Sequence, residues 1–248
     1  MSQNFRAQHE IGHRFQIDPN DLPAPKAGAI VTNRSLIVPY DGQVPQVPPG
    51  FTATPLVTGL AHPRRLLVFP NGDILVAEQK AGYLTLLRDD GSGRAQWIER
   101  HVEDLDRPYG LAWRDGNVLV ADQNGIWSVP QILGALRAGR SETQRIDQVP
   151  PQERRPVAGA YGAKMITQKG VFGLVQGHQN RPLAIDPKSG ALFVGVGSSG
   201  NLGIEPEPKA TIQSFDANGG AQKTFASGMR NPTALAFQPE TGELYALV

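Results

Sequence analysis

The sequence predicts an all-β protein of the β-propeller type, in which this chain of 248 residues contains about four blades. One hairpin pattern recurs four times along the chain, which indicates a repeated structural unit. Gly and Pro together make up about a fifth of the residues, against a usual level of about 12%, and this content favours turns over long helices. Cys is absent, so disulfides and thiolate metal sites are excluded.

Each copy of the repeat is predicted to be a β-hairpin of two short strands that are rich in β-branched and aromatic residues. The paired segments are 66–68 with 74–78, 111–113 with 118–122, 183–185 with 192–195, and 235–237 with 244–247. Between the strands stand Asn71-Gly72, Asp115-Gly116, Ser189-Gly190 and Thr241-Gly242. Such residues supply the positive φ that tight hairpins need.

The spacing of the turn glycines predicts where the blades lie. A propeller blade has roughly 40–50 residues, and the intervals from Gly72 to Gly116 and from Gly190 to Gly242 fit one blade each. The longer interval between Gly116 and Gly190 predicts an insertion around 141–169. Outer strands are expected at 82–87, 125–129 and 210–215, and one helix at 131–137.

The two ends of the chain differ from the repeat. Residues 1–48 are rich in Pro and predict an irregular N-terminal extension, so the partial propeller is expected to span 49–248. The chain ends two strands into its fourth repeat, whereas a closed propeller pairs its last blade with its first. We therefore expect the sequence to be the N-terminal part of a longer protein or a truncated gene product.

Three short motifs match functional patterns but lack the context that those patterns need. Residues 9–13 match H-E-x-x-H, yet no third zinc ligand follows within reach, and we expect a chance match. Residues 195–200 match G-x-G-x-x-G, but the prolines that follow exclude the helix of a dinucleotide site, and we expect a loop of close approach. Residues 89–93 lack the closing Glu of a calcium loop and are expected to form a turn.

The charge pattern argues against a nucleic-acid partner. The net charge is +1, and Lys and Arg are scattered among Asp and Glu, without the concentrated basic surface that DNA binding requires. No apolar run approaches the ~18 residues of a membrane span, and the N-terminus has no signal-peptide pattern.

The repeat also predicts which polar residues meet at the mouth of the propeller channel. Two neighbouring positions before each hairpin are equivalent in the four repeats. The first position is occupied by Ala61, Asp106, His178 and Arg230, and the second by His62, Arg107, Gln179 and Asn231. The innermost strands of a propeller begin at one mouth, so we expect His178, Arg230 and Asn231 to be neighbours in a concave polar site. The residues expected near its rim are Glu78, Asp122 and the region of Ser198.

This combination of side chains suits proton abstraction. A His beside an Arg and an amide fits a general base that takes a proton from a bound hydroxyl, while the Arg stabilises negative charge. The residues leave an alternative open, in which His178 and Arg230 only cap strand ends and bind backbone carbonyls.

Several stretches form a specific pattern in a fixed order: 47–51, 59–64, 107–111, Gly177-His178, 195–199 and Gly228-Met229-Arg230-Asn231-Pro232. In these stretches the sequence resembles the glucose/sorbosone dehydrogenase family, the soluble quinoproteins that use pyrroloquinoline quinone. The resemblance runs from about Pro49 to Val248 and looks closer to the sorbosone branch. It implies a six-bladed propeller in which His178 is the catalytic base and in which Arg230 and Asn231 contact the quinone cofactor.

The resemblance has further implications. It implies calcium in the full-length protein, with ligands from blades beyond residue 248, so no metal ligand is assigned in this chain. It implies a periplasmic location, although no signal peptide is present. One departure is Ser198, which stands where the glucose-oxidising members have an Asp that orients the base. In this chain Asp122, Glu78 or no acid takes that role.

The leading functional hypothesis is a quinoprotein-like oxidoreductase that oxidises a sugar or a sugar-derived aldehyde such as sorbosone. The substrate would lose a proton to His178 and a hydride to the quinone, and a separate electron acceptor would be a second partner. One alternative is a propeller lactonase, a hydrolase whose channel metal would be held by Asp106, Asp122 and Glu78. Another alternative is a non-catalytic propeller or a degenerate fragment.

Overall fold

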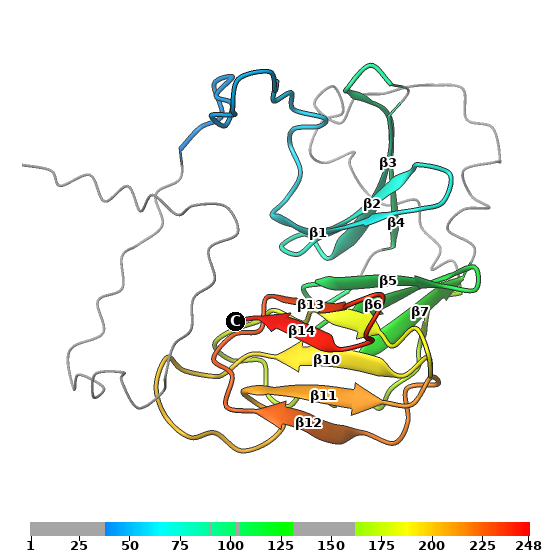
Figure 1. Cartoon of the computed structure of the whole chain (residues 1–248), viewed down its shortest axis with the longest axis vertical. Helices are drawn as coiled ribbons and strands as arrows, with labels where there is room; N and C mark the ends of the chain where they lie inside the picture. The colour runs from blue at the N-terminus through cyan, green and yellow to red at the C-terminus, as the bar shows by residue number, and fades with distance from the viewer. Residues whose placement is uncertain (1–37, 90, 103–104, 131–161) are drawn as a thin grey trace, which may run out of the picture. The chain divides into compact units, whose positions relative to one another are not determined.

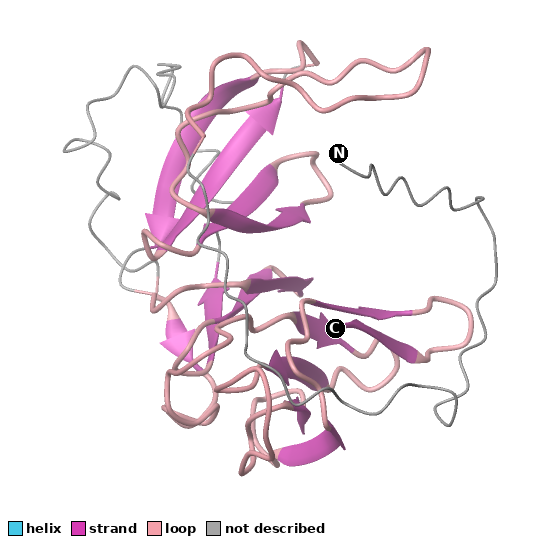
Figure 2. Cartoon of the chain, turned by 90° about the vertical axis from the view of Figure 1, so that its left-hand side faces the viewer, coloured by secondary structure: helices cyan, strands magenta, loops and turns pink. Residues whose placement is uncertain are grey.

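The computed structural model of the chain describes residues 38–89, 91–102, 105–130 and 162–248 (Figure 1). These residues form fourteen strands in four antiparallel sheets and no helix, which confirms the predicted all-β class (Figure 2). The motif at 9–13 and the expected helix at 131–137 lie outside the described residues, as does the insertion at 141–169 up to residue 161. In the described part of the chain, no helix is long and apolar enough to cross a membrane.

The chain divides into two compact units, Met1–Gln43 and Val44–Val248. Only residues 38–43 of the first unit are described, and they are exposed. All fourteen described strands belong to the second unit.

Three of the four sheets are four-stranded meanders, the strand arrangement of a propeller blade. The first contains β1 (Pro63–Val68), β2 (Ile74–Glu78), β3 (Tyr83–Asp89) and β4 (Ala95–Val102). The second contains β5 (Gly110–Arg114), β6 (Asn117–Ala121), β7 (Ile126–Pro130) and β8 (Lys164–Met165). The third contains β9 (Leu183–Ile185), β10 (Leu192–Val196), β11 (Thr211–Phe215) and β12 (Lys223–Ser227). The fourth sheet is the hairpin of β13 (Ala234–Phe237) and β14 (Leu244–Leu247).

The four predicted hairpins are the pairs β1–β2, β5–β6, β9–β10 and β13–β14, and each pair is antiparallel. The tightest turn follows directly from its sequence. Arg114 pairs with Asn117, and the two residues between them, Asp115 and Gly116, have φ of 49° and 82°. Positive φ at both central residues is typical of the two-residue hairpin turn that matches strand twist.

The expected outer strands are confirmed as β3, β7 and β11. Three strands were not predicted from the sequence: β4, β8 and β12. The short strand β8 lies inside the range expected to be an insertion and pairs with β7 as the outermost strand of the second sheet. The long interval between Gly116 and Gly190 therefore includes part of a regular blade.

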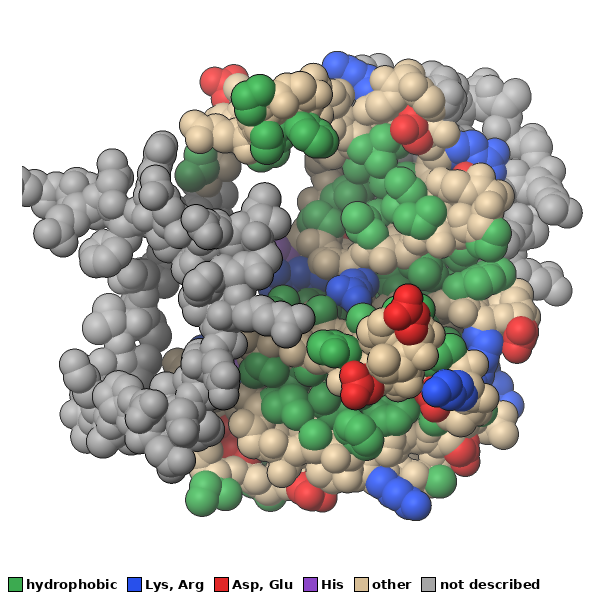
Figure 3. Space-filling view, in the orientation of Figure 1, with side chains coloured by type: hydrophobic (Ala, Val, Ile, Leu, Met, Phe, Trp, Pro, Cys, Tyr) green, Lys and Arg blue, Asp and Glu red, His purple; other side chains and the backbone are tan. Residues whose placement is uncertain are grey.

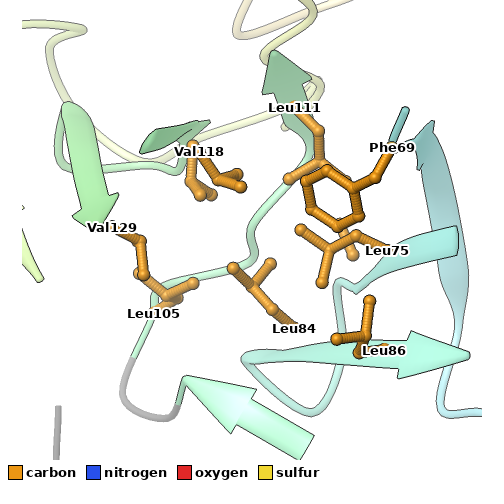
Figure 4. Close-up of a cluster of buried hydrophobic side chains, with 10 residues drawn as sticks. Phe69, Leu75, Leu84, Leu86, Leu105, Leu111, Val118 and Val129 are labelled. Atoms are coloured by element: carbon orange, nitrogen blue, oxygen red, sulfur yellow. The ribbon is translucent and has the colours of Figure 1, made fainter. Parts of the chain in front are cut away.

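The first strands of consecutive sheets are neighbours, because β1 contacts β5, β5 contacts β9 and β9 contacts β13. Apolar side chains fill the space between successive sheets. Between the first and second sheets, Leu75, Leu84 and Leu86 pack with Leu111, Val118 and Val129 (Figure 4). A second cluster joins the second and third sheets, and a smaller one joins the third sheet to the hairpin. The fold is therefore a partial β-propeller, with inner strands arranged side by side.

Two faces of this stack remain apolar and exposed (Figure 3). On β1 the side chains of Leu66 and Val68 are exposed, and on β14 those of Tyr245 and Leu247 are exposed. A groove of about 360 Å³ beside β1 is lined mainly by Leu and Val side chains. In the interior of the stack, faces of this kind are covered by the next sheet.

Candidate functional site

Loops that lead into the first strands converge at one end of the stack. Tyr109, which precedes β5, donates from its hydroxyl to the carbonyl of Thr233, which precedes β13, at 2.9 Å. Gln123, which follows β6, donates to the carbonyl of Gln179, which precedes β9, at 2.6 Å. The loops of the second, third and fourth sheets therefore meet at this end, as expected for a propeller mouth.

The structure brings His178, Arg230 and Asn231 together at this end. The backbone N–H of His178 donates to the carbonyl of Ser198 at 2.9 Å, and the N–H of Ser198 donates to the carbonyl of Arg230 at 2.8 Å. Ser198, two residues after the end of β10, thus joins the loop that carries His178 to the loop that carries Arg230. The side-chain amide of Asn180 donates to Asn231 Oδ1 at 3.2 Å.

Gly197 is needed for this close approach. A Cβ at position 197 would lie 2.5 Å from His178 Cβ, 2.8 Å from the His178 carbonyl oxygen and 3.2 Å from Asn231 Oδ1. Gly177 is equally confined, because its φ is 60° and a Cβ there would lie 2.1 Å from the Ser199 carbonyl oxygen. The close approach expected for residues 195–200 is therefore found at Gly197, and at Gly195 within β10, but not at Gly200. Irregular chain rather than a helix follows these residues.

Gly197→Ala is expected to displace the His178 loop. Because two of the three close atoms belong to the backbone or to a Cβ, they cannot rotate away, and overpacking of this kind costs about 1–3 kcal/mol of stability. A displacement of about 1 Å also lowers activity by roughly 10²-fold in a site that depends on positioning. Thermal unfolding and steady-state kinetics measure the two effects.

The matched control is Gly200→Ala, whose Cβ would meet only the Leu202 carbonyl oxygen at an ordinary 3.6 Å. It should change neither the melting temperature nor the activity appreciably. If Gly197→Ala and Gly200→Ala had the same melting temperature and the same activity, the close approach at Gly197 would be contradicted.

The electrostatic surroundings of His178 favour a neutral imidazole. Its side chain is half-buried, and burial lowers its pKa from the usual 6.5, with a further lowering by the positive charge of Arg230. A hydrogen bond with Asn201 and the carboxylate of Glu205 act in the opposite direction. The net shift is downward, so the imidazole is unprotonated, and able to accept a proton, over a wider pH range than that of an ordinary His.

Arg230→Gln is expected to raise the pKa of His178, because the substitution removes a nearby cation that disfavours the imidazolium. Glu205→Gln should lower the same pKa, because it removes a carboxylate that favours the imidazolium. NMR titration of the imidazole measures both, with the signal assigned from its absence in His178→Gln. Lys80→Gln, at an exposed residue after β2, should leave the titration unchanged, and shifts of the opposite sign would refute the arrangement.

Three polar residues of the site were missed by the sequence analysis: Asn201, Glu205 and Asn180. Asn201 Oδ1 accepts from Arg230 Nη2 at 2.6 Å and from Nε at 3.2 Å. Glu205 accepts from the backbone N–H of Ser199 at 2.5 Å and from that of Gly200 at 2.9 Å. Asn201 and Glu205 lie in the loop between β10 and β11, which is much longer than the corresponding loops of the first two sheets, so their positions could not be derived from the period.

Glu78 and Asp122, which the sequence analysis expected near the rim, are fully buried. Glu78 accepts hydrogen bonds from the backbone N–H of Ala61 and from Thr85 Oγ1. Asp122 accepts from the backbone N–H groups of Asp106 at 3.1 Å, Asn124 at 2.7 Å and Gly125 at 3.0 Å. Both carboxylates thus hold the loop that enters the first strand of their own sheet, and the carboxylate that acts on His178 is that of Glu205.

The described residues contain no group of three or more His, Asp or Glu side chains placed to hold a metal ion. Asp106 is the remaining acid considered for a channel metal. Its Oδ1 lies 3.6 Å from Arg107 Nη1 in a partly exposed ion pair.

Comparison with known proteins gives matches at the level of structure. No protein-family profile and no curated protein sequence matches the chain. The PQQ domain of pyranose dehydrogenase from Coprinopsis cinerea superposes with a TM-score of 0.58 at 18% identity, over 77% of this chain and 44% of that one. The calcium structure of the family AA12 enzyme from Trichoderma reesei gives 0.54 at 17% identity, over 77% and 47%.

A PQQ-bound aldose sugar dehydrogenase from Streptomyces coelicolor gives a TM-score of 0.50 at 19% identity, over 77% of this chain and 57% of that one. At these identities the likeness shows the fold, that of a β-propeller. The chain spans about half the length of the solved structures that it matches.

Proposed function

We propose that the protein is a quinoprotein-like oxidoreductase that oxidises a sugar or a sugar-derived aldehyde such as sorbosone, with pyrroloquinoline quinone as cofactor. The observation that carries the proposal is the placement of His178, with its lowered pKa, beside the guanidinium of Arg230 at the end where the loops of three sheets converge. Two findings support it: the propeller fold, shared with the PQQ domain of a pyranose dehydrogenase and with a PQQ-bound aldose sugar dehydrogenase, and the stretches that resemble the glucose/sorbosone dehydrogenases.

In this proposal His178 is the general base. The neutral imidazole takes the proton of the substrate hydroxyl, or of a hydrated aldehyde, as the bond between carbon and hydrogen breaks. Arg230 stabilises the negative charge that develops on the substrate oxygen or on the cofactor. Asn201 Oδ1 holds the guanidinium through two hydrogen bonds, and the negative charge of Glu205 favours the imidazolium that forms. Pyrroloquinoline quinone, when bound, supplies the two-electron acceptor for the hydride.

The residues at the site fit part of such a cofactor. Pyrroloquinoline quinone is a planar dione with several carboxylates, and Arg230 is exposed, so its guanidinium is accessible to an anionic group. Asn231 is half-buried and presents an amide. We assign the cofactor contact to Arg230 and Asn231. No residue of this chain is assigned to the calcium that the resemblance implies.

The experiment is an oxidation assay on the protein in its natural full length. Supplied with pyrroloquinoline quinone and Ca²⁺, the protein should reduce an artificial electron acceptor when an aldose or sorbosone is added. Comparing sorbosone with glucose tests the assignment to the sorbosone branch. A protein that binds the quinone yet reduces no acceptor with any of these substrates would contradict the proposal. Cell fractionation tests the periplasmic location that forms part of it.

The lactonase alternative makes a different prediction. It requires tightly bound metal without quinone, and lactone hydrolysis that a chelator abolishes. Glu78 and Asp122 are buried and already accept hydrogen bonds from backbone N–H groups, so their oxygens are poorly placed to bind a metal ion in the channel. We therefore favour the oxidoreductase. Metal analysis after dialysis distinguishes the two functions.

A further inference from the structure

The loop that enters β5 carries two charged residues at the same end of the stack as His178. Asp106 occupies the position of the repeat that is His178 in the third sheet and Arg230 in the fourth, and Arg107 follows it. The proposed oxidation uses His178 and Arg230 but gives Asp106 and Arg107 no role. Equivalent positions of a propeller face the same mouth, so these two residues are candidates for contact with the substrate.

The loop of Asp106 adjoins the loop of His178, because Gln123 binds both of them. The backbone N–H of Gln123 donates to the Asp106 carbonyl at 2.9 Å, and its side-chain amide donates to the Gln179 carbonyl at 2.6 Å. One residue therefore links the loop before β5 to the residue that directly follows His178.

The strands that follow these two loops are in direct contact. A Cβ on Gly110, the first residue of β5, would lie 2.6 Å from the Cβ of Leu183, the first residue of β9. The charge of Asp106 also reaches the loop before β9. Burial lowers the pKa of Arg181 to about 10, and the carboxylates of Asp122 and Asp106 act in the opposite direction. Asp106 therefore lies close to the loop that carries the proposed base.

His178 is flanked by a second loop on its other side. A Cβ on Gly197 would lie 2.5 Å from His178 Cβ and 3.2 Å from Asn231 Oδ1, so the loop of Asn231 adjoins His178 from the fourth sheet. The cofactor contact is assigned to that loop. The part of a sugar that is not oxidised therefore extends away from it, toward the second sheet and Asp106.

The side chains of Asp106 and Arg107 are accessible and only loosely paired. Arg107 Nη1 lies 3.6 Å from Asp106 Oδ1, and the two side chains are 45% and 39% exposed. This separation is too long for a hydrogen bond, and within the described residues no hydrogen bond engages either side chain. A carboxylate only accepts and a guanidinium only donates. The pair therefore offers an acceptor beside a donor to a ligand.

We propose that Asp106 and Arg107 bind hydroxyl groups of a neutral sugar while His178 takes the proton from another hydroxyl of the same molecule. The inference rests on the proposed function and names its substrate class. Each hydroxyl both donates and accepts, so neighbouring hydroxyls match a carboxylate beside a guanidinium. The two charges sum to zero. A uronic acid would bring its carboxylate to Asp106, and an amino sugar would bring its ammonium group to Arg107, so the pair selects neutral sugars over both.

Binding of glucose, glucuronate and glucosamine to the protein in its natural full length tests the pair without requiring oxidation. At low ionic strength, where charge effects are largest, the unaltered protein should bind glucose most tightly. Asp106→Asn leaves only the positive charge and should raise the affinity for glucuronate relative to glucose by about fivefold or more. Arg107→Gln leaves only the negative charge and should raise the affinity for glucosamine relative to glucose by a similar factor. Ligand-observed NMR titration measures these affinities.

Asp115→Asn and Arg94→Gln are the matched controls. Asp115 is exposed in the turn between β5 and β6, and Arg94 is exposed between β3 and β4. Both lie at the ends of their strands that are opposite to the mouth, so neither substitution should change the affinity ratios. The proposal is overturned if the unaltered protein prefers a charged sugar, or if Asp106→Asn and Arg107→Gln leave the ratios unchanged or shift them in the same direction.

Steady-state kinetics separates this inference from the proposed function. With the neutral sugar that is oxidised, Asp106→Asn should raise KM about tenfold and change kcat by less than about twofold, because the lost contact is made equally in the ground state and the transition state. Oxidation with an unchanged KM in Asp106→Asn would refute the pair and leave the oxidoreductase function in place. The predicted affinity ratios without oxidation of any sugar would support the pair and refute the function. No sugar binding at all would refute both.

Discussion

His178→Gln is expected to lower kcat/KM for oxidation of the sugar or aldehyde substrate by about 10²–10⁴-fold, the range contributed by a positioned general base. Gln has a similar reach but cannot accept the proton. Because the loop is held through backbone groups of His178 and through Arg181, the variant should fold, and its circular dichroism and melting temperature should match those of the unaltered protein. Steady-state kinetics with an artificial electron acceptor measures the loss.

The pH dependence gives a second readout of the same residue. The imidazole accepts a proton only when it is neutral, so kcat/KM should fall as the pH decreases through the pKa of His178. That pKa lies below the usual 6.5, and the acidic limb of the profile should therefore lie below 6.5 and vanish in His178→Gln. An acidic limb that persists in the variant would assign the base to another group.

His62→Asn is the matched control for this experiment. His62 lies one position beyond the residue of the first sheet that corresponds to His178; it is exposed and has a φ of 62°, a conformation that Asn tolerates well. The substitution should leave kcat/KM within about twofold. If both variants lose activity equally, the effect does not depend on the site at His178.

Asp122→Ala is expected to lower the free energy of unfolding by about 3 kcal/mol or more. The carboxylate accepts three backbone N–H groups in a fully buried position, and each buried donor that is left unsatisfied costs about 1–3 kcal/mol. One of these donors, Asp106, lies in the loop that enters β5. Denaturant unfolding with a constant m-value measures the loss.

A turn near the surface provides the control. Asp216 accepts from the backbone N–H groups of Asn218 at 2.8 Å and Gly220 at 3.0 Å, but it is exposed. Water can replace the carboxylate there, so Asp216→Ala should cost less than about 1 kcal/mol. Similar losses in the two variants would show that the buried position of Asp122 does not matter.

The raised pKa of Asp122 predicts how the stability of the protein changes with pH. Burial raises the pKa of Asp122 above 3.8, despite three backbone hydrogen bonds that act in the opposite direction. A raised pKa in the folded state means that protonation favours folding. The stabilisation by the bound proton is therefore complete below the unfolded pKa near 3.8 and is lost as the pH rises through the folded pKa. The difference in unfolding free energy between the unaltered protein and Asp122→Ala should decrease over that interval.

The hairpins could be predicted because the signals that make them are local. A turn such as Asp115-Gly116 requires positive φ at adjacent positions, and the apolar strands on either side pair with the register that the turn imposes. The outer strands β4, β8 and β12 carry weaker signals. The two residues of β8, for example, show no period and become a strand only through pairing with β7.

The register of the repeat also predicted that His178, Arg230 and Asn231 meet, because equivalent positions of successive blades face the same end. It could not predict Asn201 or Glu205, which come from an irregular loop, nor that Asp122 would be buried as an acceptor of backbone N–H groups. It gave no sign that Arg181 would be buried against Phe172 or that Lys209 would be buried near Gly173.

By itself, the sequence determined the all-β class, the four hairpins and the alignment of His178 with Arg230 and Asn231, since turn chemistry and period act over a few residues. The tertiary structure alone decided how these groups are tuned. Three properties depend on charge and on solvent exclusion by segments that are far apart in the chain. They are the lowered pKa of His178, the burial of Asp122, and the buried donors of Arg181 and Lys209 that have no hydrogen-bond partner among the described residues. Desolvation and Coulomb energies depend on which groups are close in space. The sequence pattern does not show which irregular loops lie close together.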